Sequence, residues 1–175
     1  MELFEAVRRR HSYRGAFKPD PVLKSDLLQI AEAGVRAPSG CNKQTTHICV
    51  VTDPQKLAAI AQLLPRPVVQ TAQAVFVIVS DCRPAYDDRS FEQQDYAAAV
   101  ENMLLAVTAL GYATVWLDGV LRHDGIAEAI ADIISLPDRA HLTVSVILPV
   151  GVPVDACPQH ERLPFNERVT FNTMG

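Results

Sequence analysis

The sequence predicts a layered domain in which helices cover both faces of one sheet. Short runs rich in β-branched residues alternate with longer segments whose apolar residues recur every three or four positions. This alternation is typical of a sheet packed between helices, and taken alone it favours parallel strands. Two observations count against that interpretation. No strand is followed by the glycine-rich turn of a dinucleotide-binding fold, and more than twenty residues follow the last core strand.

Helical periodicity predicts the helices in order. The first covers Leu3–Arg10, and Ser25 is the expected N-cap of the second. Pro38 ends that second helix, because the residue before a proline disfavours the helical conformation. Three further helices are expected around Leu57–Leu64, Gln93–Gly111 and Ile126–Ile133.

The strands are predicted from short apolar runs between these helices. Ala74–Ser80 is continuously apolar, which is typical of a strand buried on both faces. The other expected strands are His47–Thr52, Ala113–Leu117 and Leu142–Leu148, with a short candidate at Arg168–Phe171 in the polar tail.

Composition limits the possible classes of protein. The chain has 175 residues, of which 49% are hydrophobic and 21% charged, so we expect a single globular domain over residues 1–175. A net charge of −4 argues against a nucleic-acid partner, and no apolar run is long enough for a membrane segment. The four cysteines form no CxxC pair, and no signal peptide is recognisable, so we expect reduced thiols and a cytoplasmic location.

Three polar stretches are candidates for chemistry. Residues 8–14, Arg-Arg-Arg-His-Ser-Tyr-Arg, place guanidinium groups and a hydroxyl at the end of a helix, a combination suited to a phosphate. Residues 37–44, Ala-Pro-Ser-Gly-Cys-Asn-Lys-Gln, offer amide donors and acceptors suited to a planar heterocycle or a sugar-alcohol chain. Residues 116–119, Trp-Leu-Asp-Gly, end a strand, where Gly119 would admit a ligand close to the backbone. Each stretch alone is also compatible with an ordinary helix end or turn.

Together and in this order, these stretches resemble the nitroreductase family of FMN-dependent oxidoreductases. The resemblance is carried by Arg-His-Ser-x-Arg at 10–14, Ala-Pro-Ser-Gly-x-Asn-x-Gln at 37–44, and Trp116 to Gly119 after a long helix. Val-Gly-Val-Pro at 150–153 and Arg-Leu-Pro at 162–164 complete the pattern near the end of the chain. The similarity spans nearly the whole sequence.

The resemblance implies a cofactor site made of several segments. Arg10, Ser12 and Arg14, with the backbone of His11, would hold the FMN phosphate and ribityl chain, and Arg162 would complete the phosphate clamp. A second subunit would contribute contacts to the ring and ribityl chain from Pro38, Ser39, Gly40, Asn42 and Gln44. Asp118 and Gly119 would lie beside the ring, with a backbone N–H directed at flavin N5.

The resemblance also implies the fold and the assembly. It predicts an α+β, three-layer α/β/α sandwich with a mixed, largely antiparallel sheet, in place of the parallel sheet that periodicity favours. It further predicts a homodimer with shared active sites, in which a C-terminal extension of about residues 152–175 docks on the partner subunit.

The implied activity is hydride transfer from NADH or NADPH, through FMN, to a small oxidised acceptor such as a nitroaromatic or a quinone. The flavin would perform the chemistry, so no side chain is expected as a nucleophile and none as a metal ligand. Two alternatives remain at this point: a non-catalytic flavin-binding or redox-sensor module, and a dimeric scaffold without a cofactor.

Two features near the second stretch depart from the family or invite a second interpretation. Family members usually follow the position of Gln44 with Pro-Trp, whereas this chain has Thr45-Thr46, which alters local packing near the flavin. Cys41 lies within the same loop and is either a redox thiol or an inert packing residue, the latter being the expectation.

Overall fold

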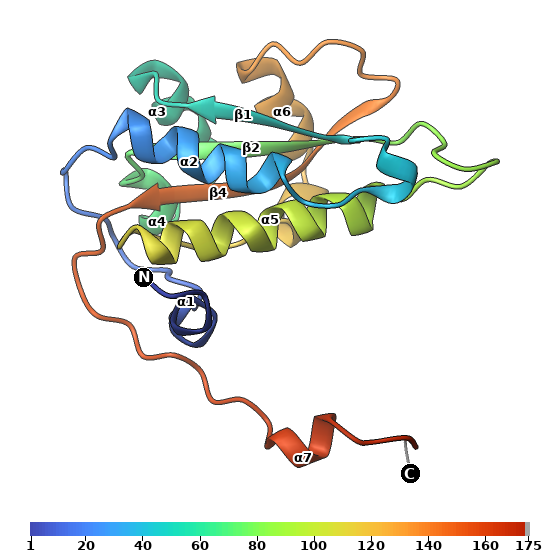
Figure 1. Ribbon diagram of the computed structural model, residues 1–175. Helices are drawn as coiled ribbons and strands as arrows, with labels where there is room; N and C mark the ends of the chain where they lie inside the picture. Colours follow the sequence, from blue (N-terminus) through green and yellow to red (C-terminus); the bar gives the residue numbers. More distant parts are fainter. Residues whose placement is uncertain (174–175) are drawn as a thin grey trace.

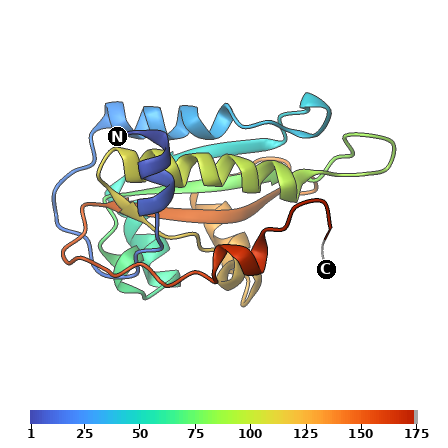
Figure 2. The ribbon, with the colours of Figure 1, turned by 60° about the horizontal axis from the view of Figure 1, so that its bottom comes forward.

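The computed structural model describes residues 1–173 and shows three layers, with a sheet between two layers of helices (Figures 1 and 2). The helices are α1 (Leu3–Arg9), α2 (Lys24–Val35), α3 (Pro54–Leu63), α4 (Pro67–Gln70), α5 (Glu92–Ala109), α6 (Ile126–Ile133) and α7 (Phe165–Arg168). The strands are β1 (Thr46–Val51), β2 (Ala74–Asp81), β3 (Ala113–Thr114) and β4 (Leu142–Gly151). Two 3₁₀ turns, η1 (Gly40–Asn42) and η2 (Gly119–Arg122), lie in two of the candidate stretches.

The described sheet has the strand order β1-β2-β4-β3, and every neighbouring pair is antiparallel. The parallel arrangement favoured by periodicity is therefore wrong, and the three-layer, antiparallel arrangement implied by the family resemblance is confirmed. The periodicity was misleading for a physical reason. All eight residues of β2 are buried because helices cover both faces, and two-sided burial gives the same apolar run in either strand direction.

Two separate cores hold the layers together. On one face, Phe76 and Ile78 of β2 pack with Ile30 of α2 and Met103 of α5. On the other face, alternate residues of β2, among them Val77, pack with α3, α4 and α6. α5 thus lies along the sheet. The chain segments near its two ends are anchored on it.

Most predicted elements are present with ends shifted by a few residues, α4 and α7 were not predicted, and three differences matter for the argument. α2 begins at Lys24, with Leu23 as N-cap, so Ser25 lies inside the first turn and is not the cap. β3 covers two residues only, because beyond Thr114 the chain forms an isolated bridge from Leu117 to Ile147 of β4. The strand expected at Arg168–Phe171 is wrong: Arg168 ends α7, and residues 169–173 belong to no strand.

The C-terminal segment leaves the sandwich after β4 and passes α1 before reaching α7 (Figure 1). Its large apolar side chains are exposed, including Leu163 at 66%, Phe165 at 73% and Phe171 at 83%. Residues 174 and 175 of the expected extension lie outside the described residues. None of the helices within residues 1–173 has the length and hydropathy needed to cross a membrane.

Candidate active site

The segment after α1 is anchored by Tyr13. The Tyr13 N–H donates to the Thr114 carbonyl of β3 at 2.9 Å, and its hydroxyl donates to the Ala16 carbonyl at 2.6 Å. Its side chain is 3% exposed and packs on Phe17, with the ring centroids 5.4 Å apart. Sequence reasoning missed this anchor, which fixes the backbone between Ser12 and Arg14.

Arg10 lies at the end of α1 and is held over α5. Its Nε is 3.5 Å from Oε1 of Glu101, and its side chain is only 19% exposed. Its neighbour His11 is half-buried, with Nδ1 at 2.9 Å from the Arg9 carbonyl. Glu101 therefore orients the arginine and partly balances its charge.

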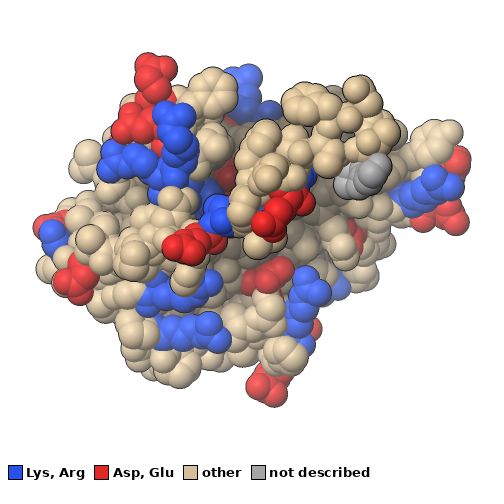
Figure 3. Space-filling model, turned by 90° about the horizontal axis from the view of Figure 1, so that it is seen from below, with Lys and Arg blue, Asp and Glu red and all other residues tan. Residues whose placement is uncertain are grey.

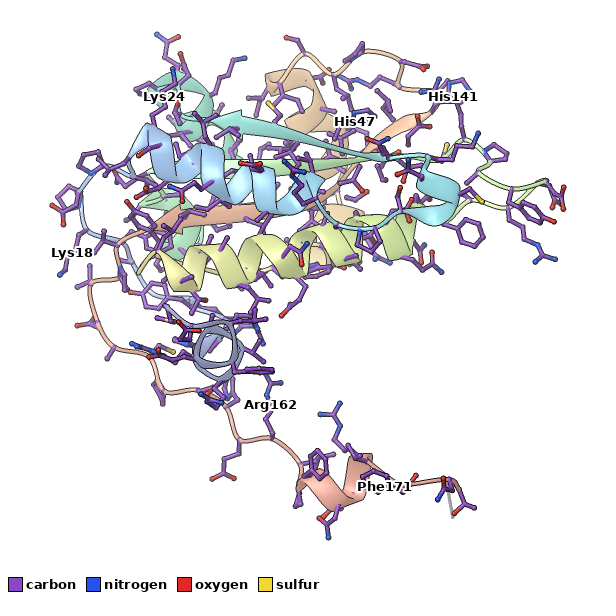
Figure 4. The ribbon with its side chains drawn as sticks, in the orientation of Figure 1. Lys18, Lys24, His47, His141, Arg162 and Phe171 are labelled. Carbon is purple, nitrogen blue, oxygen red and sulfur yellow. The ribbon has the colours of Figure 1, made fainter. Side chains whose placement is uncertain are left out.

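The C-terminal segment meets this same region. Nε2 of Gln159 donates to the Arg10 carbonyl at 3.0 Å, although the two residues are 149 positions apart in sequence. Figure 4 shows Arg162 just beyond α1, on the same side of the molecule. Seen from below, this face carries several groups of basic side chains with acidic ones between them (Figure 3). The structure thus brings both predicted phosphate-binding ends of the chain to one side.

A cavity of about 210 Å³ lies beneath this segment. It is lined by His11 and Tyr13, by the end of α5, and by residues 155–157 of the C-terminal segment. Tyr112 also lines it; burial raises the pKa of Tyr112, and so does the hydrogen bond that its hydroxyl donates to Asp26 Oδ2 at 2.7 Å. This hydrogen bond ties the end of the cavity wall to the start of α2.

The loop of residues 38–44 has an unusual backbone. Cys41, Asn42 and Gln44 have φ angles of 50°, 53° and 54°, the left-handed region that non-glycine residues seldom adopt. The loop is closed by the Gln44 N–H, which donates to Ser39 Oγ at 2.9 Å. Cys41 is exposed, so the expected packing role does not hold within the chain.

Asp95 of α5 holds this loop and was not among the predicted residues. Its Oδ1 accepts from the Gly40 N–H at 2.8 Å, and its Oδ2 accepts from the Thr45 hydroxyl at 2.6 Å. The only trace of this arrangement in the sequence is Thr45 itself, because the proline usual in the family has no hydroxyl to donate. A cavity of about 270 Å³ lies behind the loop and includes Asp95 and Thr46 in its wall.

Within one chain the two predicted halves of the site lie apart. The loop of residues 38–44 is fixed to Asp95 near the start of α5, whereas His11 shares its cavity with Thr108 near the end of that helix. Asp95 and Thr108 are thirteen positions apart, about 20 Å along the helix axis, whereas Arg10 pairs with Glu101, which is six positions or about 9 Å from Asp95. Figure 2 shows α1 and η1 near opposite ends of α5.

The third stretch lies beyond β3. Leu117 exchanges backbone hydrogen bonds with Ile147, at 3.2 and 2.9 Å, and this pairing fixes the start of the next loop. Asp118 forms an ion pair with Arg122 at 3.4 Å. Apart from Gly119 and its two chain neighbours, no atom of residues 1–173 lies within 4 Å of the position that a Cβ on Gly119 would take, so the backbone here is open to an approaching ligand.

Comparison with known proteins agrees with this architecture. The family model described as "Nitroreductase family" matches residues 7–67 and 58–152, most of the chain. The chain belongs to the nitroreductase family. A relative from Archaeoglobus fulgidus, named "Putative NADH dehydrogenase/NAD(P)H nitroreductase", is 29% identical over 160 residues, covering 88% of this chain and 87% of the relative. An "NADPH-dependent oxidoreductase" of Staphylococcus saprophyticus is 26% identical, covering 93% and 70%.

Solved structures of the family superpose on nearly the whole chain. A nitroreductase-family crystal structure from Desulfovibrio desulfuricans, described as being in complex with FMN, has a TM-score of 0.82 and 26% identity, with 100% of this chain and 99% of that chain covered. A Bacteroides thetaiotaomicron structure also has a TM-score of 0.82, at 23% identity, and shows the shared fold. Within residues 1–173, no group of three or more His, Cys, Asp or Glu side chains could hold a metal ion.

Proposed function

We propose that this nitroreductase-family chain is an oxidoreductase that uses FMN to pass hydride from NADH or NADPH to a small oxidised acceptor, such as a nitroaromatic or a quinone. Family membership supports the general class, and the FMN complex of the Desulfovibrio desulfuricans protein supports the cofactor. The names of the relatives, which include NAD(P)H nitroreductase and NADPH-dependent oxidoreductase, support the electron donor.

The observation that carries the proposal is the hydrogen bond from Gln159 to the Arg10 carbonyl. It brings Gln159 of the C-terminal segment beside Arg10, which supports a phosphate and ribityl site formed by Arg10, Ser12, Arg14 and the backbone of His11 together with Arg162. Guanidinium groups bind phosphate through short, charge-assisted hydrogen bonds. The ordered Arg10 and the exposed Arg14 fit that donor set.

The rest of the site would come from a second copy of the chain. The loop of residues 38–44 is anchored on Asp95 near the start of α5, whereas the segment around His11 lines a cavity with Thr108 near the end of that helix. The family resemblance assigns the contacts from Pro38, Ser39, Gly40, Asn42 and Gln44 to the flavin bound by the partner. The exposed apolar side chains of residues 152–173 support docking of this extension on that partner. Each subunit would be a single domain of residues 1–175.

Asp118 and Gly119 would border the ring. The open backbone at Gly119 would let a main-chain N–H approach N5, and the bound flavin supplies the hydride chemistry. The chain's own residues then bind, orient and shield the ring, and none acts as a nucleophile. Fixed cations and N–H groups near the pyrimidine edge would stabilise the anionic reduced state.

The test is to purify the protein with FMN and measure its reduction without oxygen. We expect a yellow protein that releases FMN on heating and whose flavin absorbance is bleached by NADH or NADPH. A panel of nitroaromatics and quinones should then restore the absorbance. A colourless protein that takes up no added FMN would exclude the proposal, and a bound flavin that both nicotinamides leave oxidised would favour the sensor alternative.

A further inference from the structure

The loop of residues 38–44 holds a backbone that it would not adopt alone. Three of its non-glycine residues, Cys41, Asn42 and Gln44, have φ angles between 50° and 54°. Each such residue costs conformational free energy and persists only where the surrounding structure compensates for it. Asparagine tolerates this region well, whereas cysteine and glutamine do not. Something outside the loop must therefore stabilise its shape.

Asp95 is the polar group that does so. Its carboxylate accepts from the Gly40 N–H at 2.8 Å and from the Thr45 hydroxyl at 2.6 Å, which are the two flanks of the left-handed segment. Asp95 is 4% exposed, so both bonds are shielded from water. Hydrogen bonds accepted by a carboxylate are about twice as strong as those between neutral groups, and Asp95 lies in the first turn of α5, next to the loop that it holds.

Phe91 gives the same loop an apolar contact. A Cβ added to Gly40 would lie 2.5 Å from Cδ2 of Phe91, so only glycine lets the loop approach this ring. Phe91 is the N-cap residue of α5, four positions before Asp95. One end of α5 therefore holds the loop by a carboxylate and an aromatic ring together.

We propose that Asp95 is a positioning residue for the flavin: through Gly40 and Thr45 it fixes the conformation in which Ser39, Asn42 and Gln44 meet the ring bound by the partner subunit. This role rests on the proposed function. It also assigns a role to Thr45, because a proline at that position would leave Oδ2 of Asp95 without the hydroxyl donor.

Two pairs of substitutions separate the hydrogen bonds from other effects. Asp95→Ala removes both bonds, whereas Asp95→Asn keeps an oxygen for the Gly40 N–H and offers an N–H to the Thr45 hydroxyl, which can accept. Thr45→Val removes the hydroxyl at nearly constant volume, and Thr45→Ser keeps it. Gln94→Ala, on an exposed neighbour of Asp95 in the same helix, is the matched control.

The first measurement is hydrogen exchange of the protein without FMN. We expect faster exchange across residues 38–44 in Asp95→Ala and Thr45→Val, with unchanged exchange in β2 and β4. Thr45→Ser and Gln94→Ala should match the parent chain, and Asp95→Asn, which keeps both bonds but loses the charge, should lie between the parent and Asp95→Ala. Unchanged exchange in Thr45→Val would overturn the anchoring role. Because this variant retains the buried carboxylate, it still tests the role if Asp95→Ala fails to fold.

The second measurement is the FMN dissociation constant and the visible spectrum of the bound flavin. We expect affinity to fall about tenfold in Asp95→Ala, the loss expected for hydrogen bonds to a charged group, and less in Thr45→Val, with partial rescue in Asp95→Asn and full rescue in Thr45→Ser. Faster exchange in the loop with unchanged affinity and spectrum would overturn the role toward flavin. Failure of the parent chain to bind FMN would instead refute the proposed function, and the flavin role with it.

Discussion

In the sandwich, residues 3–151, large side chains such as Phe76 and Ile30 have no exposed surface, whereas in the C-terminal segment, residues 152–173, Phe165 and Phe171 are 73% and 83% exposed. The sandwich buries its two cores within one chain, although some surface side chains, such as Phe4 at 72% and Leu28 at 60%, remain exposed. The segment carries comparable side chains and leaves them in water, and its contact with the sandwich includes the Gln159 to Arg10 hydrogen bond. Apolar surface that the chain does not bury indicates a surface suited to a second molecule.

The largest effect should follow truncation of the sandwich core. Phe76→Ala removes a fully buried ring and should lower the free energy of unfolding by about 3–5 kcal/mol, since it combines lost burial with a cavity. Urea denaturation checks this, and the loss should be the same at every protein concentration. A loss below 1 kcal/mol would mean that the two cores do not stabilise the fold as described.

Phe165→Ala is the matching change in the C-terminal segment. We expect the free energy of unfolding of one chain to change by less than about 0.5 kcal/mol, as for other exposed positions. Self-association should weaken, so the unfolding midpoint should fall below that of the parent only at concentrations where the parent is dimeric. Sedimentation velocity gives the oligomeric state, and a parent chain that is monomeric throughout would exclude the docking proposed for this segment.

The next prediction tests whether the sandwich and the segment share one ligand. Each charge-assisted phosphate contact is worth about 1.5–3 kcal/mol, so replacing both Arg10 and Arg162 by alanine should weaken FMN binding at least a hundredfold. Each single substitution should contribute, although one arginine lies in the sandwich and the other in the segment. Arg36→Ala, which removes an exposed arginine at the end of α2 that pairs with Glu32, is the control. Unchanged affinity in the double variant would place the phosphate elsewhere.

The sequence was sufficient for the order of the longer helices and strands, because periodicity depends on local composition, but it missed the short helices α4 and α7. Strand direction could not be derived in this way, since the residues of β2 are buried on both sides whatever their neighbours' direction. The family resemblance corrected it. Asp95 escaped notice because an acid in the first turn of a helix is common, and its partner Thr45 lies 50 positions away. The prediction of a strand at Arg168–Phe171 was wrong. A β-strand needs a neighbouring strand to pair with, and a short run of residues does not show whether one is present.

The smallest effect is expected for an ion pair at the edge of the sandwich. The exposure of its two side chains lies between that of the buried core and that of the C-terminal segment. Asp81 ends β2 with its side chain 12% exposed, whereas Arg83 is 55% exposed in the loop that follows. Nε of Arg83 lies 2.9 Å from both carboxylate oxygens, and this hydrogen bonding is the main cause that holds the pKa of Asp81 below its usual value. A carboxylate with a lowered pKa stabilises the fold above its unfolded pKa, about 3.9, and loses that stabilisation as the pH falls through the folded value.

Arg83→Gln should therefore lower Tm at pH 7 by about 1 °C, a small shift because water screens the exposed guanidinium. The difference from the parent chain should shrink as the pH falls below 4 and vanish once Asp81 is protonated in both proteins. Differential scanning calorimetry between pH 3 and pH 7 measures it, with Asp81→Asn expected to be insensitive to the same arginine substitution. A Tm difference that stays constant across this range would show that Arg83 acts by packing. The edge of the sandwich would then be stabilised by side-chain contacts, as its core is.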